Sequence, residues 1–358
     1  MTHVLAAGDH FVAPALFVDA ITRHAGADAP ADRALSFSEL VLPWPLEPFG
    51  AVGDVDEASG TEDELIAAVD GATAAVTQMA PFTRRVFERS PELRFVGVCR
   101  GGPVNVDLAA ASEAGVLVSF APGRNAVAAA EYAIGLMLAA MRRIAATDRE
   151  LRTGTWRGDY YTYENAGLEL DGATVGLIGY GAIGRIVSRV LSAFGASVLT
   201  HDPYADPAGV ALDGVELVSL DDLLRRSSVV SLHARLTPET RHMIDAEKLS
   251  LLPHGAILVN SARGGLLDYA PLPDLLSSGR LGALALDVYD IEPPPAGWPL
   301  MSAPNVVMTP HLAGATRQTA ERAADIIGAD VARFLRGERP EYLANPEVWD
   351  VVADRALP

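Results

Sequence analysis

Residues 175–184 read VGLIGYGAIG, an apolar run that leads directly into three glycines spaced G-x-G-x-x-G. A short apolar run of this kind is typical of a buried strand, and helix-forming residues follow over 185–194. The glycines therefore stand at a turn between a strand and a helix. A G-x-G-x-x-G pattern alone is weak evidence, but strand before and helix after is the context in which this turn binds phosphate.

Each glycine has a separate task at such a turn. Gly179 permits the tight turn, Gly181 leaves room for a pyrophosphate, and Gly184 lets helix and strand pack closely. The free N–H groups at the start of the helix, including those of Ala182 and Ile183, attract phosphate oxygens. The sequence therefore predicts a dinucleotide-binding site at these residues.

The next predicted strand, 197–202, selects the kind of dinucleotide. It ends on Asp202, 18 positions after Gly184. A carboxylate there accepts hydrogen bonds from the ribose hydroxyls and repels a 2′-phosphate. NAD is therefore favoured over NADP as the cofactor.

Strands and helices alternate along the whole chain, which is typical of an α/β protein. After residue 173 the pattern predicts six strands with helical crossovers, which suits a Rossmann-type doubly wound parallel sheet. Before residue 121 it predicts a smaller, flavodoxin-like parallel α/β unit, with 43–60 irregular. The predicted strands are 3–7, 74–77, 94–99, 116–120, 174–179, 197–202, 229–233, 257–260, 283–288 and 306–309.

We accordingly expect two α/β domains with the active site in the cleft between them. The substrate-binding domain would take residues 1–123, and the NAD-binding domain residues 124–312. Residues 313–358, with a helix over 316–335, would return to the substrate-binding domain. A long helix over 126–144 is apolar nearly all round, so it must be buried in a core or in a subunit interface.

Composition narrows the possible partners. The formal net charge is −18, and so acidic a surface repels nucleic acid and anionic lipid. The single cysteine, Cys99, excludes an intrachain disulfide and fits a reducing compartment. The first ten residues lack a signal-peptide pattern, no membrane span is expected, and no cluster has metal-ligand spacing. We expect a cytoplasmic protein without a metal.

Three charged side chains follow strands of the second block, on the edge where open α/β sheets bind ligands. They are Arg263, Glu292 and His311. An arginine binds a carboxylate in a bidentate manner, and a histidine transfers protons near neutral pH. A neighbouring carboxylate orients the imidazole ring and stabilises its charged form. This set suits the reduction of a keto acid.

Together with the glycine turn, these segments make the chain resemble the D-isomer-specific 2-hydroxyacid dehydrogenase family, which includes phosphoglycerate, hydroxypyruvate and D-lactate enzymes. The resemblance extends from about residue 76 to residue 335. It implies that Arg263 binds the substrate, that Glu292 supports His311 as general acid and base, and that Asp287 contacts the nicotinamide. It also implies a homodimer formed through the 126–144 helix.

The resemblance also places the substrate loop and further cofactor contacts. Backbone N–H groups of 98–102 would hold the substrate carboxylate, and Gln78, which follows a strand, is a further substrate-side candidate. Arg100 departs from the family pattern, and we hypothesise that it serves a second carboxylate or a phosphate. The substrate-binding candidates are Cys99, Arg100, Gly101, Gly102 and Gln78, and the additional cofactor-binding candidates are His233, Thr237 and Ala262.

Two other functions stay open beside an NAD-dependent dehydrogenase for a small D-2-hydroxy acid. A formate dehydrogenase uses a related scaffold, but pairs its histidine with glutamine, against which Glu292 argues. An NAD-sensing corepressor keeps the arginine, glutamate and histidine as an interaction protein. The sequence leaves open which 2-hydroxy acid is the substrate and whether it carries a second negative group.

Overall fold

The computed structural model describes residues 2–26 and 35–350, which form two compact units. Unit 1 comprises residues 1–125 and 315–358, and unit 2 comprises residues 126–314. These boundaries lie two residues from those expected from the sequence. Within the described ranges, no helix combines the length and the apolar character needed to cross a membrane.

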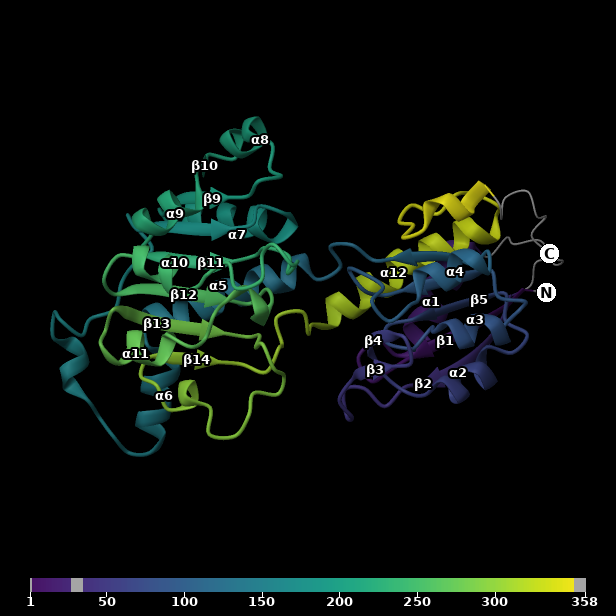
Figure 1. The fold of residues 1–358 in the computed structure, drawn as a ribbon, viewed down its shortest axis with the longest axis horizontal. Helices are drawn as coiled ribbons and strands as arrows, with labels where there is room; N and C mark the ends of the chain where they lie inside the picture. Colours follow the sequence, from purple (N-terminus) through teal and green to yellow (C-terminus); the bar gives the residue numbers. More distant parts are fainter. Residues whose placement is uncertain (1, 27–34, 351–358) are drawn as a thin grey trace. The chain divides into compact units, whose positions relative to one another are not determined.

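Unit 1 is built on a five-stranded parallel sheet with the order β2-β1-β5-β6-β7 (Figure 1). Successive side chains of a strand point to opposite faces, and both faces of this sheet are covered. Val4 and Ala6 of β1 pack with one cluster, whereas Leu5 and Ala7 pack with another. The strands are β1 (Thr2–Gly8), β2 (Leu35–Val41), β5 (Ala74–Thr77), β6 (Phe95–Val98) and β7 (Leu117–Phe120).

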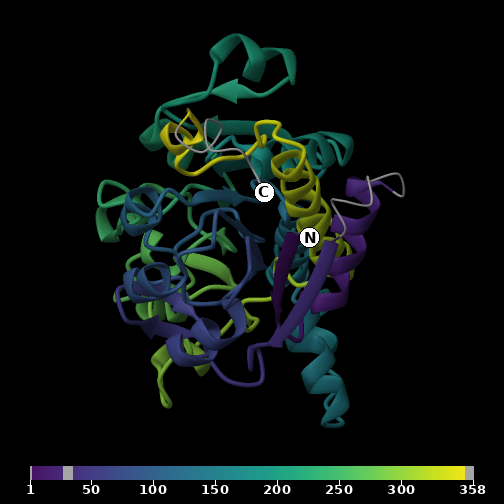
Figure 2. The ribbon, with the colours of Figure 1, turned by 90° about the vertical axis from the view of Figure 1, so that its right-hand side faces the viewer.

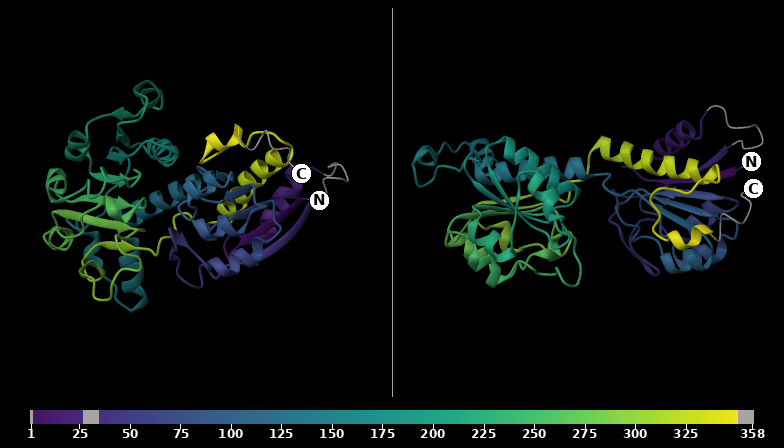
Figure 3. Two further views of the ribbon diagram at one scale, coloured as in Figure 1. Left: turned by 45° about the vertical axis from the view of Figure 1, so that its right-hand side comes forward. Right: turned by 90° about the horizontal axis from the view of Figure 1, so that it is seen from above.

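The C-terminal helix α12 (Arg317–Leu335) belongs to unit 1, where it packs against α1 (Pro14–Ala25). Figure 2 shows α12 in yellow beside α1 in purple. These two helices cover one face of the sheet. The other face is covered by α2 (Glu62–Val69), α3 (Arg84–Arg89) and α4 (Leu108–Glu113), as the right-hand view of Figure 3 shows.

Unit 2 is a seven-stranded parallel sheet with the order β10-β9-β8-β11-β12-β13-β14. The order reverses direction between β8 and β11, which is the topological switch point of a doubly wound sheet. Helices α5 (Ala126–Met141) and α7 (Ala182–Ala193) cover one face, and α9 (Leu220–Arg226), α10 (Ala246–Leu251) and α11 (Leu272–Ser277) cover the other. The strands are β8 (Thr174–Ile178), β9 (Ser197–His201), β10 (Glu216–Leu217), β11 (Val229–Leu232), β12 (Ala256–Asn260), β13 (Leu281–Leu286) and β14 (Val306–Met308).

Three predictions on the elements are wrong, and two of them concern strands. Residues 43–60 are not wholly irregular, because β3 (Gly50–Val52) and β4 (Val55–Ala58) form a hairpin. Its two-residue turn is Gly53-Asp54, with Gly53 at φ 58°, a combination favoured in tight hairpins. The edge strands β2 and β10 are absent from the predicted set. Both lie at a sheet edge, where a weaker apolar pattern suffices.

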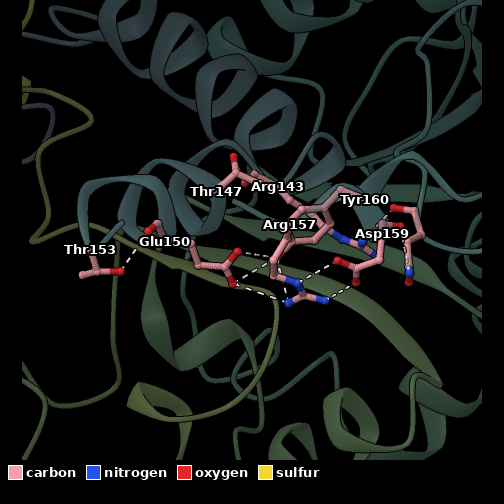
Figure 4. Close-up of polar contacts among 8 residues, drawn as sticks. Arg143, Thr147, Glu150, Thr153, Arg157, Asp159 and Tyr160 are labelled. Atoms are coloured by element: carbon pink, nitrogen blue, oxygen red, sulfur yellow. Dashed lines mark hydrogen bonds and ion pairs between the residues drawn. The ribbon is translucent and has the colours of Figure 1, made fainter. Parts of the chain in front are cut away.

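The predicted helix 126–144 is interrupted. Helix α5 ends at Met141, Arg143 adopts a left-handed φ of 54°, and α6 (Ile144–Arg152) begins in a new direction. We call residues 144–168 the arm. Figure 4 shows its polar network: Arg157 stacks on the Tyr160 ring, 4.5 Å from its centroid, while the Tyr160 hydroxyl donates to Glu150. The arm is thus an ordered structure with its own internal contacts.

We expect the return of α12 to be essential to unit 1. Phe334 of α12 stacks on Phe95 of β6 with ring centroids 5.0 Å apart, and both side chains are fully buried. Replacing Phe334 with alanine should lower the free energy of unfolding of this unit by about 3–5 kcal/mol, measured by urea denaturation. Phe194→Ala, at a half-exposed phenylalanine of unit 2, is the control and should change it by less than about 0.5 kcal/mol. Equal losses of unfolding free energy in the two variants would contradict the claim that α12 is essential to unit 1.

Candidate active site

The glycine turn of unit 2 lies between β8 and α7, as the sequence predicts. Gly179 has a φ of 101°, a backbone conformation that side chains rarely allow. A Cβ atom on Gly179 would lie 2.7 Å from the backbone nitrogen of Ala234. The residue must therefore be glycine both for its conformation and because the backbone after β11 approaches it.

The other two glycines have the geometry of a phosphate-binding turn. A Cβ on Gly184 would lie 2.4 Å from the carbonyl oxygen of Gly179, so helix and turn are in close contact there. Gly181 is different, because a Cβ there would meet nothing within 4 Å. No residue in the described part of the chain accepts a hydrogen bond from the N–H of Ala182 or Ile183. Open space and free donors at a helix start suit a pyrophosphate.

Asp202 directly follows β9 and ties the glycine turn to that strand. Its Oδ2 accepts a hydrogen bond of 2.7 Å from the backbone N–H of Tyr180, and its Oδ1 accepts one of 2.9 Å from Tyr204. A carboxylate oxygen has more than one lone pair, so both oxygens can still accept from ribose hydroxyls. The residue therefore fits the adenosine end of a dinucleotide.

His233 and Thr237 lie in the segment after β11, next to the glycine turn. The backbone N–H of His233 donates to the carbonyl of Ile178 at 2.7 Å. Its Nε2 is buried without a partner within the described residues, and burial lowers the pKa of the ring to about 4. His233 is thus neutral near pH 7. Thr237 is exposed and caps its own turn through hydrogen bonds with Thr240.

The chemistry-bearing residues follow three neighbouring strands. Strand β12 pairs parallel with β13, which pairs parallel with β14, so their carboxyl ends meet at one edge of the sheet. Arg263 follows β12, Glu292 follows β13 and His311 follows β14. The topology therefore gathers residues separated by up to 48 positions in the chain (311 − 263).

The central contact is a hydrogen bond of 2.6 Å between His311 Nδ1 and Glu292 Oε2. The second carboxylate oxygen, Oε1, accepts from the backbone N–H of Tyr289 at 2.9 Å, which fixes the orientation of the carboxylate. The side chains of His311 and Glu292 are 42% and 29% exposed. Since Nδ1 is engaged with Glu292, Nε2 is the ring nitrogen left to face a reactant.

The surroundings of Glu292 keep it ionised. Burial favours the neutral carboxyl, but the hydrogen bonds from His311 and Tyr289 and the charge of Arg263 outweigh it and lower the pKa of Glu292. A negative glutamate next to the ring stabilises an imidazolium. The pair is therefore suited to hold a proton on His311 and to release it.

Asp287, fully buried, holds the loop that carries the histidine. Its carboxylate accepts hydrogen bonds from the Thr309 hydroxyl at 2.6 Å and from the backbone N–H groups of Leu312 and Ala313. Its carbonyl accepts from the N–H of His311 at 2.8 Å, and His311 itself has a left-handed φ of 55°. Such a backbone conformation in a histidine needs support from its surroundings. Asp287 therefore positions His311, and its expected contact with the nicotinamide stays a prediction.

Arg263 is held through its backbone while its side chain is exposed. The buried Asn260 clamps the turn, since its Nδ2 donates to the carbonyl of Arg263 and its Oδ1 accepts from the N–H of Ala262. A Cβ on Gly264 would lie 2.0 Å from the carbonyl carbon of Tyr289, so this turn packs directly on the segment that leads to Glu292. Asn260 is a site residue that the sequence prediction missed. Its signal is a strand-end asparagine, which commonly bonds backbone two residues on.

The predicted substrate loop lies in unit 1, and only part of it has free donors. The N–H of Cys99 donates to Thr77 and that of Arg100 to Val98, each at 2.7 Å, so neither is available to a carboxylate. By contrast, the N–H groups of Gly101 and Gly102 donate to no residue that the structure describes, and space is open around both. Of the N–H groups of residues 99–102, those of Gly101 and Gly102 are therefore the ones available to a substrate carboxylate.

Arg100 is not the free cation that the sequence suggested. Its guanidinium forms an ion pair with Glu57 of β4 and also donates to the Glu57 carbonyl at 3.0 Å. A second anion would have to compete with a carboxylate already in place. Glu57 had no signal in the sequence, because its contact with Arg100 depends on the β3–β4 hairpin.

The sequence of the chain is similar to those of known dehydrogenases and reductases. Residues 134–313 match the model of the "D-isomer specific 2-hydroxyacid dehydrogenase, NAD binding domain". The D-3-phosphoglycerate dehydrogenase of Mycobacterium bovis is 42% identical over 293 residues, which cover 80% of this chain and 54% of that protein. The glyoxylate reductase of Korarchaeum cryptofilum is 37% identical over 297 residues, covering 83% of this chain and 90% of that protein.

Solved structures share the fold over nearly the whole chain. The TT0316 protein of Thermus thermophilus superposes with a TM-score of 0.76 at 32% identity, covering 96% of this chain and all of that one. The chain spans only about half the length of the first curated relatives, 54% in the case quoted above. The comparison thus covers both units, and the matched model is that of an NAD-binding domain whose range includes the turn at Gly179.

We expect Gly181→Val to weaken NADH binding by about tenfold or more, because the new side chain would fill the space open to the pyrophosphate. NADH affinity is measured by quenching of protein fluorescence. Gly50→Val is the matched control, since a Cβ there also meets nothing within 4 Å but lies in unit 1. Unchanged NADH affinity in the Gly181 variant would refute the placement of the cofactor.

Proposed function

Because the chain belongs to the D-isomer specific 2-hydroxyacid dehydrogenase family, we propose that it interconverts a D-2-hydroxy acid and its 2-keto acid with NAD as cofactor. The observation that supports this most is the 2.6 Å hydrogen bond between His311 Nδ1 and Glu292. It orients a proton-transferring imidazole beside the strand ends at which open α/β sheets bind ligands.

NAD, when bound, supplies or accepts the hydride. The glycine turn fits its pyrophosphate and Asp202 its ribose, by the free N–H groups and lone pairs described above. In the reductive direction, Nε2 of His311 donates a proton to the carbonyl oxygen that becomes the hydroxyl. Glu292 stabilises the imidazolium before that transfer. In the oxidative direction the same nitrogen removes the hydroxyl proton.

Arg263 completes the proposed chemistry. Its exposed guanidinium lies close enough to Glu292 to lower the pKa of that carboxyl, and it presents planar donors that suit a carboxylate and a carbonyl oxygen. The free N–H groups of Gly101 and Gly102 are the proposed second set of donors for the substrate carboxylate. Gln78 is proposed on the substrate side of unit 1, and Ala262 and Thr237 on the cofactor side.

The two rival functions make different predictions. A formate dehydrogenase has no alcohol proton to move, so the ionised Glu292 would have no task in it. An NAD-sensing interaction protein would bind NADH without turning over any 2-keto acid. NADH consumption with a panel of 2-keto acids therefore separates these functions from the proposed one.

Replacing His311 with asparagine should lower kcat for reduction of a 2-keto acid by about 10²–10⁴-fold, because the proton donor is lost. Glu292→Gln should lower kcat in the same direction, since the amide cannot stabilise an imidazolium. Both variants should bind NADH as the wild type does, because neither residue touches the glycine turn. Steady-state kinetics and an NADH titration test this together. A kcat within about threefold of the wild type in the His311 variant would remove the proposed mechanism.

We also propose that the chain forms a homodimer through α5 and the arm. Helix α5 is apolar on most of its surface, and the arm continues from it. Three aromatic side chains of the arm are almost fully exposed: Trp156 (85%), Tyr161 (98%) and Tyr163 (93%). Because the polar network around Tyr160 keeps the arm ordered, these aromatics are displayed on a defined structure. A second copy of the chain would bury them.

Replacing Trp156, Tyr161 and Tyr163 together with serine should shift the protein from dimer to monomer in analytical ultracentrifugation, since it removes the apolar area of the arm. Tyr204→Ser is the control, because Tyr204 is 96% exposed in unit 2 outside the arm. A wild-type monomer, or a triple variant that remains dimeric, would count against this interface.

A further inference from the structure

The carboxyl edge of the sheet in unit 1 gathers polar side chains from four neighbouring strands. Ala7 of β1 pairs with Thr77 of β5, which pairs with Val98 of β6, which pairs with Phe120 of β7. The residues that follow these four positions therefore leave the sheet side by side. Polar groups at this edge are Asp9, Gln78, Arg100 and Arg124.

The Arg124 side chain has no hydrogen bond or ion pair with any residue that the structure describes. Its guanidinium donates to no acceptor in residues 2–26 and 35–350, and its Nη1 is buried. Burial lowers the pKa of Arg124, with the nearby charge of Arg100 acting in the same direction. An arginine nevertheless stays protonated in proteins. A desolvated cation without hydrogen bonds is costly, and a ligand oxygen would remove that cost.

Two acceptors at the same edge are also unused. Asp9 Oδ1 accepts from the backbone N–H groups of Phe11 and Val12, each at 2.8 Å, but Oδ2 is buried without a partner within the described chain. The Oε1 atom of Gln78 is likewise buried without a hydrogen-bond partner among the described residues. Asp9 lies within electrostatic range of Arg124, yet no hydrogen bond joins them. Among the described residues, the edge thus holds one unpaired donor group and two unpaired acceptor atoms.

The charges at this edge do not favour a phosphate. Arg100 is neutralised by Glu57, and the charge of Arg124 is opposed by Asp9 nearby. A dianion would gain one unpaired cation and meet one carboxylate. A hydroxyl group fits better, because its oxygen can accept from Arg124 while its hydrogen is donated to Asp9 or Gln78.

We propose that Arg124, Asp9 and Gln78 form a subsite for the hydroxyl-bearing carbon chain of the substrate. The ligand class is a polyhydroxylated 2-hydroxy acid or its 2-keto form, and not a phosphorylated one. The inference rests on the proposed dehydrogenase function, whose substrate it specifies. Asp9 and Gln78 are only 1% and 3% exposed, so the proposed subsite opens only on a side-chain rearrangement, which we assign to the unbonded Arg124.

Ligand binding, measured by calorimetry with NADH present, tests this subsite without requiring turnover. The probes are D-gluconate, 2-hydroxyhexanoate of equal chain length without the extra hydroxyls, and 3-phosphoglycerate. We expect gluconate to bind at least about tenfold more tightly than each of the other two. Equal binding of gluconate and 2-hydroxyhexanoate, or tightest binding of 3-phosphoglycerate, overturns the proposal.

Two variants assign the effect to these residues. Arg124→Met removes the donors, and Asp9→Asn keeps an oxygen for Phe11 and Val12 while replacing the unpaired acceptor with an amide donor. Each should remove the preference for gluconate over 2-hydroxyhexanoate. Arg85→Met is the control, because Arg85 is held on the surface by Glu62 and Asp63. If Arg124→Met loses affinity for both acids by the same factor, Arg124 has only a structural role, and the proposed subsite is overturned.

Reduction of glyoxylate by NADH, assayed in parallel, reports on the proposed function alone. Turnover of glyoxylate without a gluconate preference leaves the dehydrogenase standing and rejects the subsite. Absence of turnover with every 2-keto acid rejects the dehydrogenase. A gluconate preference that Arg124→Met abolishes would still support the subsite in that case.

Discussion

The hydrogen bond between His311 and Glu292 depends on two neighbouring parallel strands, β13 and β14, ending at one edge of a sheet. A histidine and a glutamate 19 positions apart meet only because β13 and β14 pair in register and their loops turn toward each other. Asp287 reinforces this arrangement, since its buried carboxylate bonds the backbone beyond His311 and supports its left-handed conformation. The position of the His311 ring is therefore set by buried backbone contacts, although the ring itself is partly exposed.

The residues that fit the cofactor lie at the same edge of the unit 2 sheet. On the other side of the switch point, β8 leads into the glycine turn and β9 into Asp202, which bonds the turn through Tyr180. Open space lies at Gly181, and the N–H groups of Ala182 and Ile183 next to it donate to no described residue, whereas the charged groups follow β12 to β14. The proposed phosphate-binding and proton-transferring groups thus follow the strands of one sheet at the same edge.

Whether a feature could be predicted from the sequence depends on how far apart in the chain its interacting residues lie. The glycine turn, Asp202 and the strands that carry Arg263, Glu292 and His311 were readable because local patterns define them. The Glu57–Arg100 ion pair could not be predicted, since it joins a hairpin to a loop 43 residues away. This ion pair occupies Arg100, which the sequence had suggested as a free cation for the substrate. Asp9 and Arg124 carry no local signal either. They become informative only when the sheet order places them at one edge, where Asp9 Oδ2 and Arg124 Nη1 have no hydrogen-bond partner among the described residues.

The central claim is that hydride passes between the nicotinamide and C2 of the acid while His311 moves the proton. The most direct measurement uses NADH deuterated at C4 of the nicotinamide on the transferred face, with a 2-keto acid that the protein turns over, and analyses the product by NMR. The account predicts one deuterium at C2 of a D-2-hydroxy acid. A product without deuterium at C2, or no product from any 2-keto acid despite bound NADH, would contradict it.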